Sequence, residues 1–193
     1  MSDSINNLNA LSPDDRRQLL AIARDSVSHG LSHRHALPVD PAQFSLPLQA
    51  VRASFVTLRI ESELRGCIGM LSATRPLVED VARNAFAAAF RDTRFKPVAE
   101  YEYHLLNYHL SILSPSELMT VTSQDDLLAQ LRPGVDGLII EEVPRRATFL
   151  PDVWQTLPEP EQFLAHLKQK AGFDADYWSD RIQCWRYTTE SIE

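Results

Sequence analysis

The residues best suited to chemistry lie in one hexapeptide, Leu64-Arg65-Gly66-Cys67-Ile68-Gly69. Arg65 and Cys67 are two residues apart, so both side chains point to the same face of an extended strand. A guanidinium beside a thiol favours the thiolate, which is the reactive form of cysteine. The pair therefore predicts a nucleophile or redox thiol at Cys67, assisted by Arg65.

Cys67 also has a purely structural interpretation. Free cysteine is among the most buried residue types and often only fills space in a core. No histidine is adjacent to Cys67 in the sequence, although His109 can approach it from another strand and act as its base. Both roles therefore stay open for Cys67, and His109 is a candidate site residue.

The two glycines of the hexapeptide need a reason, because glycine weakens the interior of a strand. Gly66 and Gly69 indicate a bulge, or the close approach of another backbone or a ligand. Arg65 can then clamp a phosphate or carboxylate with the help of nearby backbone N–H groups, or it can form a structural ion pair with an acid such as Asp92. Asp92 and Arg94 in turn are candidates for this site, or for a helix cap and a bridge between lobes.

Two further groups of residues are candidates for sites. Thr148 can line a cleft, although a hydroxyl at a strand edge is the commoner case. His29, His33 and His35 suggest a metal site, but we expect Gly30 to break the helical register that would align the first two. The sequence therefore predicts no metal site and no cofactor.

The elements that position these residues mix helices and strands without a regular β–α–β rhythm. This pattern is typical of an α+β fold in which helices pack on a mainly antiparallel sheet. Spacing of apolar residues and capping signals predict helices over 13–30, 74–89, 123–131 and 159–171. Alternating apolar residues predict strands over 51–71 with a break at 61–63, and over 108–113, 138–150 and 181–188, while 31–48 reads as a loop.

Composition and charge narrow the function classes. The chain has 193 residues, of which 44% are hydrophobic, and a formal net charge of -7. An acidic surface repels phosphate backbones, so the GxxG spacing of the hexapeptide is weak evidence for nucleic-acid binding. The sequence has neither a signal-peptide pattern nor an apolar run long enough to span a bilayer, and its two cysteines lie far apart. These features predict a soluble cytoplasmic protein with reduced thiols.

The hexapeptide resembles the signature of the AMMECR family, also called AmmeMemoRadiSam system protein A. Asp152 departs from the family pattern, in which Gln is more usual after Leu-Pro. The resemblance extends over roughly residues 12–188. Further matches follow in the family's order at Phe55–Leu58, Ala88–Phe95, Ser111–Ser114, Gly134–Leu138, Thr148–Pro151 and Lys170–Gly172.

The resemblance implies one AMMECR domain over 12–188, made of a larger and a smaller lobe with the signature near a cleft. Residues 1–11 are then expected to be a flexible N-terminus and 189–193 a C-terminal tail. It also implies a partner or substrate-presenting component that acts with a Memo-like protein and a radical SAM protein, without a membrane. The alternative is an enzyme on a small anionic substrate, with Cys67 as thiolate and Arg65 as anion clamp. A homo-oligomer stays open.

Overall fold

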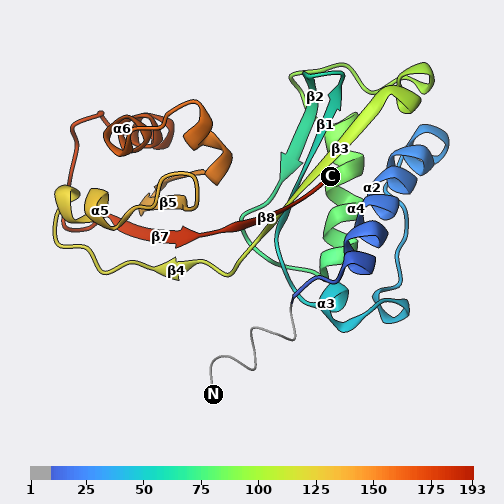
Figure 1. The fold of residues 1–193 in the computed structure, drawn as a ribbon. Helices are drawn as coiled ribbons and strands as arrows, with labels where there is room; N and C mark the ends of the chain where they lie inside the picture. Colours follow the sequence, from blue (N-terminus) through green and yellow to red (C-terminus); the bar gives the residue numbers. More distant parts are fainter. Residues whose placement is uncertain (1–9) are drawn as a thin grey trace. The chain divides into compact units, whose positions relative to one another are not determined.

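The structure, a computed structural model, describes residues 10–193, and the chain divides into two compact units that each contain one sheet (Figure 1). The first unit contains the described residues up to Leu113 together with Glu190–Glu193, and the second contains Ser114–Thr189. The recorded strand registers are all antiparallel, and helices are interspersed between the strands. The α+β prediction with a mainly antiparallel sheet is therefore confirmed.

The sheet of the first unit has four strands in the order β2-β1-β3-β8. Its strands are β1 (Ser54–Ile60), β2 (Glu63–Gly69), β3 (Leu106–Leu113) and β8 (Thr189–Ile192). The segment that forms β8 lies within the C-terminal tail expected over 189–193, beyond the span of the family resemblance. Ile192 is nevertheless buried in the core of the first unit, which gives this end of the chain a reason to pair with the sheet.

Helices α2 (Pro13–His33) and α4 (Leu77–Phe90) lie on the same face of this sheet (Figure 1). Val56 and Leu58 of β1 point toward the helices, and the intervening Thr57 points away from them. The loop expected over 31–48 is interrupted by two short helices. The smaller elements of this unit are η1 (Pro41–Gln43), α3 (Leu46–Gln49) and η2 (Glu100–Leu105).

Gly30 does not end the first helix, contrary to the sequence prediction. Helix α2 continues to His33 and is capped by Arg34 in the left-handed conformation, with φ of 63°. A Cβ atom added to Gly30 would lie 2.5 Å from the ring of Phe90 and 2.7 Å from that of Phe86. The glycine is therefore needed because α4 packs closely here, and a buried contact of this kind leaves no signal in the local sequence.

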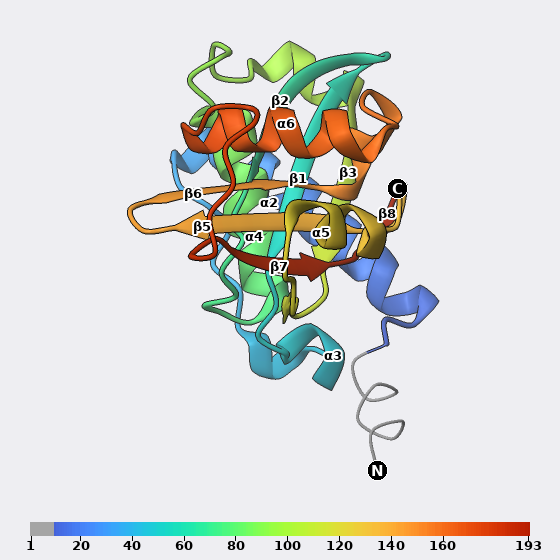
Figure 2. The same ribbon diagram turned by 90° about the vertical axis from the view of Figure 1, so that its left-hand side faces the viewer.

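The second unit has a four-stranded sheet in the order β4-β7-β5-β6, with helix α6 beside β5 and β6 (Figure 2). The indole of Trp154 stacks on Phe163 with ring centroids 3.8 Å apart, and both residues belong to the core of this unit. The elements are β4 (Glu117–Leu118), α5 (Gln124–Gln130), β5 (Gly137–Glu142), β6 (Arg145–Phe149), η3 (Pro151–Gln155), α6 (Pro160–Ala171) and β7 (Gln183–Tyr187).

The flexible N-terminus expected over 1–11 lies outside the described residues, except for Ala10 and Leu11. Leu11 is buried in the core of the first unit, and Ser12 caps α2 by accepting a hydrogen bond from the backbone N–H of Asp15. Between residues 10 and 193, no helix has both the length and the apolar character that crossing a membrane requires.

Candidate functional site

The hexapeptide lies in β2, an edge strand whose two faces have different surroundings. Gly66 and Ile68 face the helices, whereas Cys67 points to the opposite face, as the alternation predicted. A Cβ atom added to Gly66 would lie 2.1 Å from the backbone carbonyl oxygen of Ala88 in α4. The close approach of another backbone is therefore what requires glycine at position 66.

Gly69 is also explained by packing. A Cβ atom at this position would lie 2.3 Å from the ring of Phe55 and 2.4 Å from the carbonyl oxygen of Ser54, both on the neighbouring strand β1. The predicted bulge lies in β2 itself: Leu58 pairs with Gly66 and Arg59 with Leu64, so Arg65 is the extra residue. Neither glycine of the hexapeptide is thus needed to make room for a ligand.

Arg65 forms a bidentate ion pair with Glu102 of η2. Its Nε and Nη2 atoms donate to the two carboxylate oxygens of Glu102 at 2.8 and 2.9 Å, and the two side chains are only 14% and 15% exposed. The hydrogen bonds from Arg65 lower the pKa of the Glu102 carboxyl. The structure therefore shows the ion pair that we weighed for Arg65, with Glu102 rather than Asp92 as the acid.

Asp92 and Arg94 instead hold the backbone of Cys67. The Asp92 carboxylate accepts from the Cys67 N–H at 2.9 Å and from Nη2 of Arg94 at 2.7 Å. The same guanidinium donates to the Cys67 carbonyl oxygen at 3.3 Å. These hydrogen bonds, above all those from Arg94, hold the pKa of the Asp92 carboxyl well below its usual range. Two of the candidate residues are therefore brought to Cys67, at its main chain.

The thiol of Cys67 lies at one end of a polar row on the sheet face opposite the helices. Thr57 of β1 is paired in register with Cys67 on one side and with His109 of β3 on the other. Its hydroxyl donates to the half-buried Sγ of Cys67 at 3.2 Å. We call Cys67, Thr57 and His109 the polar row.

His109 is not placed to act directly as a base for Cys67. Strand β1 lies between their two strands, and two strand spacings amount to about 10 Å. The imidazole Nδ1 of His109 instead lies 3.4 Å from a carboxylate oxygen of Glu193, and its Nε2 lies 3.5 Å from the hydroxyl of Ser111. The polar row is thus a line of neighbours in which Thr57 separates the thiol from the imidazole.

The remaining candidate residue and the second cysteine belong to the second unit. The hydroxyl of Thr148 donates to the carbonyl oxygen of Leu138 at 2.8 Å and lies 2.9 Å from the hydroxyl of Tyr187. Cys184 is fully buried, and this burial raises the pKa of its thiol to about 12. Cys184 is therefore an inert core residue, in contrast to the half-buried Cys67.

Histidines gather at the end of α2, but in the described part of the chain no three metal-binding side chains are arranged to hold an ion. The continuous helix does align His29 with His33, so the reason we gave for excluding a metal site was wrong. Their rings stack with centroids 4.0 Å apart, and the ring of His35 lies 4.7 Å from that of His29. Stacked rings of this kind do not direct their nitrogens at one metal ion.

Thr57 and Glu102 are the site residues that the sequence did not reveal. Strand alternation places Thr57 on the face opposite Val56 and Leu58, but only the register of the sheet sets it beside Cys67. Glu102 is 37 residues from Arg65 and lies in a short helical segment with no motif around it. Partners of this kind depend on long-range packing, which one sequence does not specify.

Comparison with known proteins gives consistent results along most of the chain. A family model described as AMMECR1 matches residues 20–192. A protein of Methanothermobacter thermautotrophicus is 37% identical over 176 residues, which is 88% of each chain. A protein of Methanocaldococcus jannaschii is 37% identical over 150 residues, which is 74% of this chain and 73% of that protein. The crystal structure of an uncharacterised protein from Pyrococcus horikoshii is similar with a TM-score of 0.80 and 30% identity, covering 90% of this chain and 88% of that one.

Proposed function

Because the chain belongs to the AMMECR1 family, as the hexapeptide predicted, we propose that it is a partner or substrate-presenting component acting with a Memo-like protein and a radical SAM protein. One observation supports this proposal above the others. The charged side chains around β2 are already engaged in hydrogen bonds and ion pairs within the protein. The thiol of Cys67 has Thr57, and not a histidine, as its neighbour. Such a site is suited to presenting a rigid surface more than to catalysing a reaction alone.

The edge of β2 has the composition expected of a contact surface. Leu64 and Met70 at the two ends of the strand are 36% and 42% exposed, and the side chain of Arg94 between them is 56% exposed. Exposed methionine and arginine side chains are enriched where proteins bind one another. The bonds of Arg94 to Asp92 and to the Cys67 carbonyl fix its guanidinium in place, which reduces the entropy lost on binding.

Mixing the purified protein with its Memo-like and radical SAM partners tests this proposal. Sedimentation velocity at micromolar concentrations should show a complex, and Arg94→Glu should weaken it about tenfold or more. Arg17→Glu, at an exposed position on α2, is the matched control and should leave the complex unchanged. No association with either partner at these concentrations would contradict the direct form of the proposal.

A second candidate function, an enzyme acting on a small anionic substrate through Cys67, is favoured by the hydroxyl of Thr57. This hydroxyl donates a hydrogen bond to Sγ of Cys67, and Cys67 is accessible whereas Cys184 is buried. In this candidate the anion clamp is Arg94 rather than Arg65. The guanidinium of Arg65 is occupied by Glu102, while that of Arg94 is exposed and contacts the Cys67 main chain.

Competing alkylating agents of different charge test the second candidate. Iodoacetate carries a carboxylate and iodoacetamide does not, so a clamp beside Cys67 should favour iodoacetate about threefold to tenfold relative to glutathione. Arg94→Gln should remove this preference, whereas Arg17→Gln should retain it. A preference equal to that of glutathione in the unmodified protein would remove the case for an anionic substrate at Cys67.

A further inference from the structure

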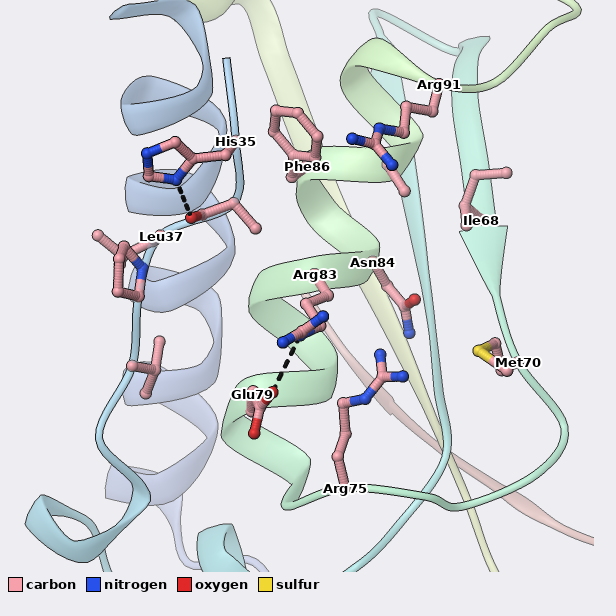
Figure 3. A pocket seen from close by; sticks show the side chains of 14 residues that line it. His35, Leu37, Ile68, Met70, Arg75, Glu79, Arg83, Asn84, Phe86 and Arg91 are labelled. Atoms are coloured by element: carbon pink, nitrogen blue, oxygen red, sulfur yellow. Dashed lines mark hydrogen bonds and ion pairs between the residues drawn. The ribbon is translucent and has the colours of Figure 1, made fainter. Parts of the chain in front are cut away.

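A groove runs across α4 on the side of the sheet away from the polar row (Figure 3). It has a volume of about 700 Å³ and lies between the segment 35–39, the surface of α4 and the end of β2. Ile68 of the hexapeptide lines it, so the two faces of β2 border two different sites. We call it the α4 groove.

Three arginines line the α4 groove in a chain whose net charge is -7. Arg83 pairs with Glu79 at 2.9 Å, one turn earlier on α4. Arg75 lies 3.7 Å from the buried carboxylate of Asp80, a long distance for an ion pair. Positive charge therefore exceeds negative charge in the groove, with only Glu79 among its lining residues carrying a carboxylate.

Arg91 is the guanidinium with the most unused binding capacity. Within residues 10–193 its recorded side-chain contact is with the ring of Phe86, whose centroid lies 5.2 Å from its Cζ, and it has no ion pair. A guanidinium stacked on an aromatic ring keeps its N–H groups free at the ring edge. Arg91 is thus oriented by Phe86 while its donors remain available to an anion.

The spacing along α4 leaves room for that anion. Arg83 and Ala87 lie four residues apart on α4, and Arg91, the C-cap of the helix, follows four residues later with its N–H bonded to the Ala87 carbonyl oxygen, so the three form one ridge. All three line the groove, and the methyl group of Ala87 is small enough to leave a hollow between the two longer side chains. A phosphate or carboxylate over Ala87 lies within one helical turn of Arg91 on one side and of Arg83, which also pairs with Glu79, on the other.

The wall facing this ridge is apolar. Ile68 and Met70 approach from the end of β2, and Leu37 approaches from the opposite side (Figure 3). Val39 also lines the groove. Ligand pockets of about 300–1,000 Å³ usually combine an apolar lining with a few polar groups that fix orientation. The α4 groove has both the size and this division of its lining.

We propose that the α4 groove binds a small organic anion. Its phosphate or carboxylate lies over Ala87 between Arg83 and Arg91, and its apolar or aromatic body lies against Ile68 and Met70. Arginine forks bind the oxygens of both kinds of anion in pairs, so the shared chemistry of the ligand is an oxyanion on an apolar body. This binding site is separate from the polar row and does not depend on the function proposed for it.

Titration of the labelled protein with small probes, followed by amide NMR shifts, tests the proposal. Phenyl phosphate should shift amides that line the groove, and it should bind about tenfold more tightly than inorganic phosphate because its ring contacts the apolar wall. Benzoate in a parallel titration distinguishes a carboxylate ligand from a phosphate ligand. Absence of saturable shifts in the groove with both aromatic probes would overturn the proposal.

Variants of the residues on this ridge distinguish a specific anion-binding site from a general attraction of anions to arginine. Ala87→Leu fills the hollow with a good helix former and should abolish binding without loss of helix content. Arg91→Gln should weaken phenyl phosphate binding about tenfold, because one of two charged donors is removed. Arg17→Gln on α2 is the control and should bind as the unmodified protein does. Equal affinity in the Arg91→Gln and Arg17→Gln proteins would contradict the assignment.

Discussion

The two faces of β2 place different constraints on the size and chemistry of their residues. On the helix face, Gly66 lies against the backbone of α4, where even a methyl group would meet the carbonyl oxygen of Ala88 at 2.1 Å. On the other face, Cys67 is half-buried and accepts a hydrogen bond from Thr57. Two adjacent residues of one short motif thus have unrelated roles. Gly66 permits close packing against α4, and Cys67 presents a thiol on the other face. A motif is therefore best interpreted one face at a time.

The largest expected effect is the difference in alkylation rate between Cys67 on β2 and the second cysteine, Cys184. Burial raises the pKa of Cys184 to about 12, so at neutral pH its thiolate is on the order of 10³-fold scarcer than that of a free thiol near 8.5. Because Cys184 is also fully buried while Cys67 is half-buried, native protein treated with iodoacetamide should be alkylated at Cys67 at least about 10³-fold faster than at Cys184. Peptide mass spectrometry measures both rates, and similar rates would show that the two thiols do not differ as described.

Substitution of the two adjacent residues tests the packing face directly. Gly66→Ala should lower the free energy of unfolding by about 3 kcal/mol, because the new methyl group meets the backbone of α4 rather than a movable side chain. Cys67→Ala, one residue along on the open face, is the control and should cost about 1 kcal/mol or less. Urea denaturation measures both values, and a Gly66→Ala cost no larger than the control would contradict the packing role.

The contacts of Asp92 predict a pH-dependent contribution to stability. Since the pKa of Asp92 is lowered in the folded state, its carboxylate stabilises the fold above the unfolded pKa of about 3.9, and the effect is lost as pH falls below it. Asp92→Asn should therefore cost about 1–2 kcal/mol at neutral pH and progressively less below about pH 4. Denaturation of both proteins across this range checks the sign, and a cost independent of pH would count against a charged Asp92.

The smallest effect is expected on the open face, at Thr57. Thr57→Val keeps the shape of the side chain but removes the hydrogen bond to Sγ of Cys67, which is worth about 1 kcal/mol. Alkylation of Cys67 at neutral pH should slow about fivefold, the rate equivalent of that energy. Thr57→Ser keeps the hydroxyl and should react like the unmodified protein. An unchanged rate in the valine variant would mean that Thr57 does not tune the thiol.

Much of the fold was accessible from local sequence patterns, and the site was accessible only in part. Alternation placed Cys67 on the face of β2 opposite Gly66 and Ile68, but it does not describe Arg65, which lies in a bulge. The helix predicted over 159–171 is present as α6 and ends at Gly172 in the left-handed conformation. The pairing of Arg65 with Glu102 was not accessible, because it joins segments 37 residues apart. The role of Gly30 was misread for the same reason, since its neighbours Phe86 and Phe90 belong to another helix.

The hydrogen bonds that hold Cys67 have a consequence for the behaviour of the protein at high concentration. An edge strand with free N–H and C=O groups is a template on which a strand of another molecule can form, and this pairing starts aggregation. Asp92 takes the outward N–H of Cys67, and Arg94 takes its C=O. Two side chains of the same molecule thus occupy the positions that a foreign backbone would need, and they keep the middle of β2 from recruiting other copies of the chain.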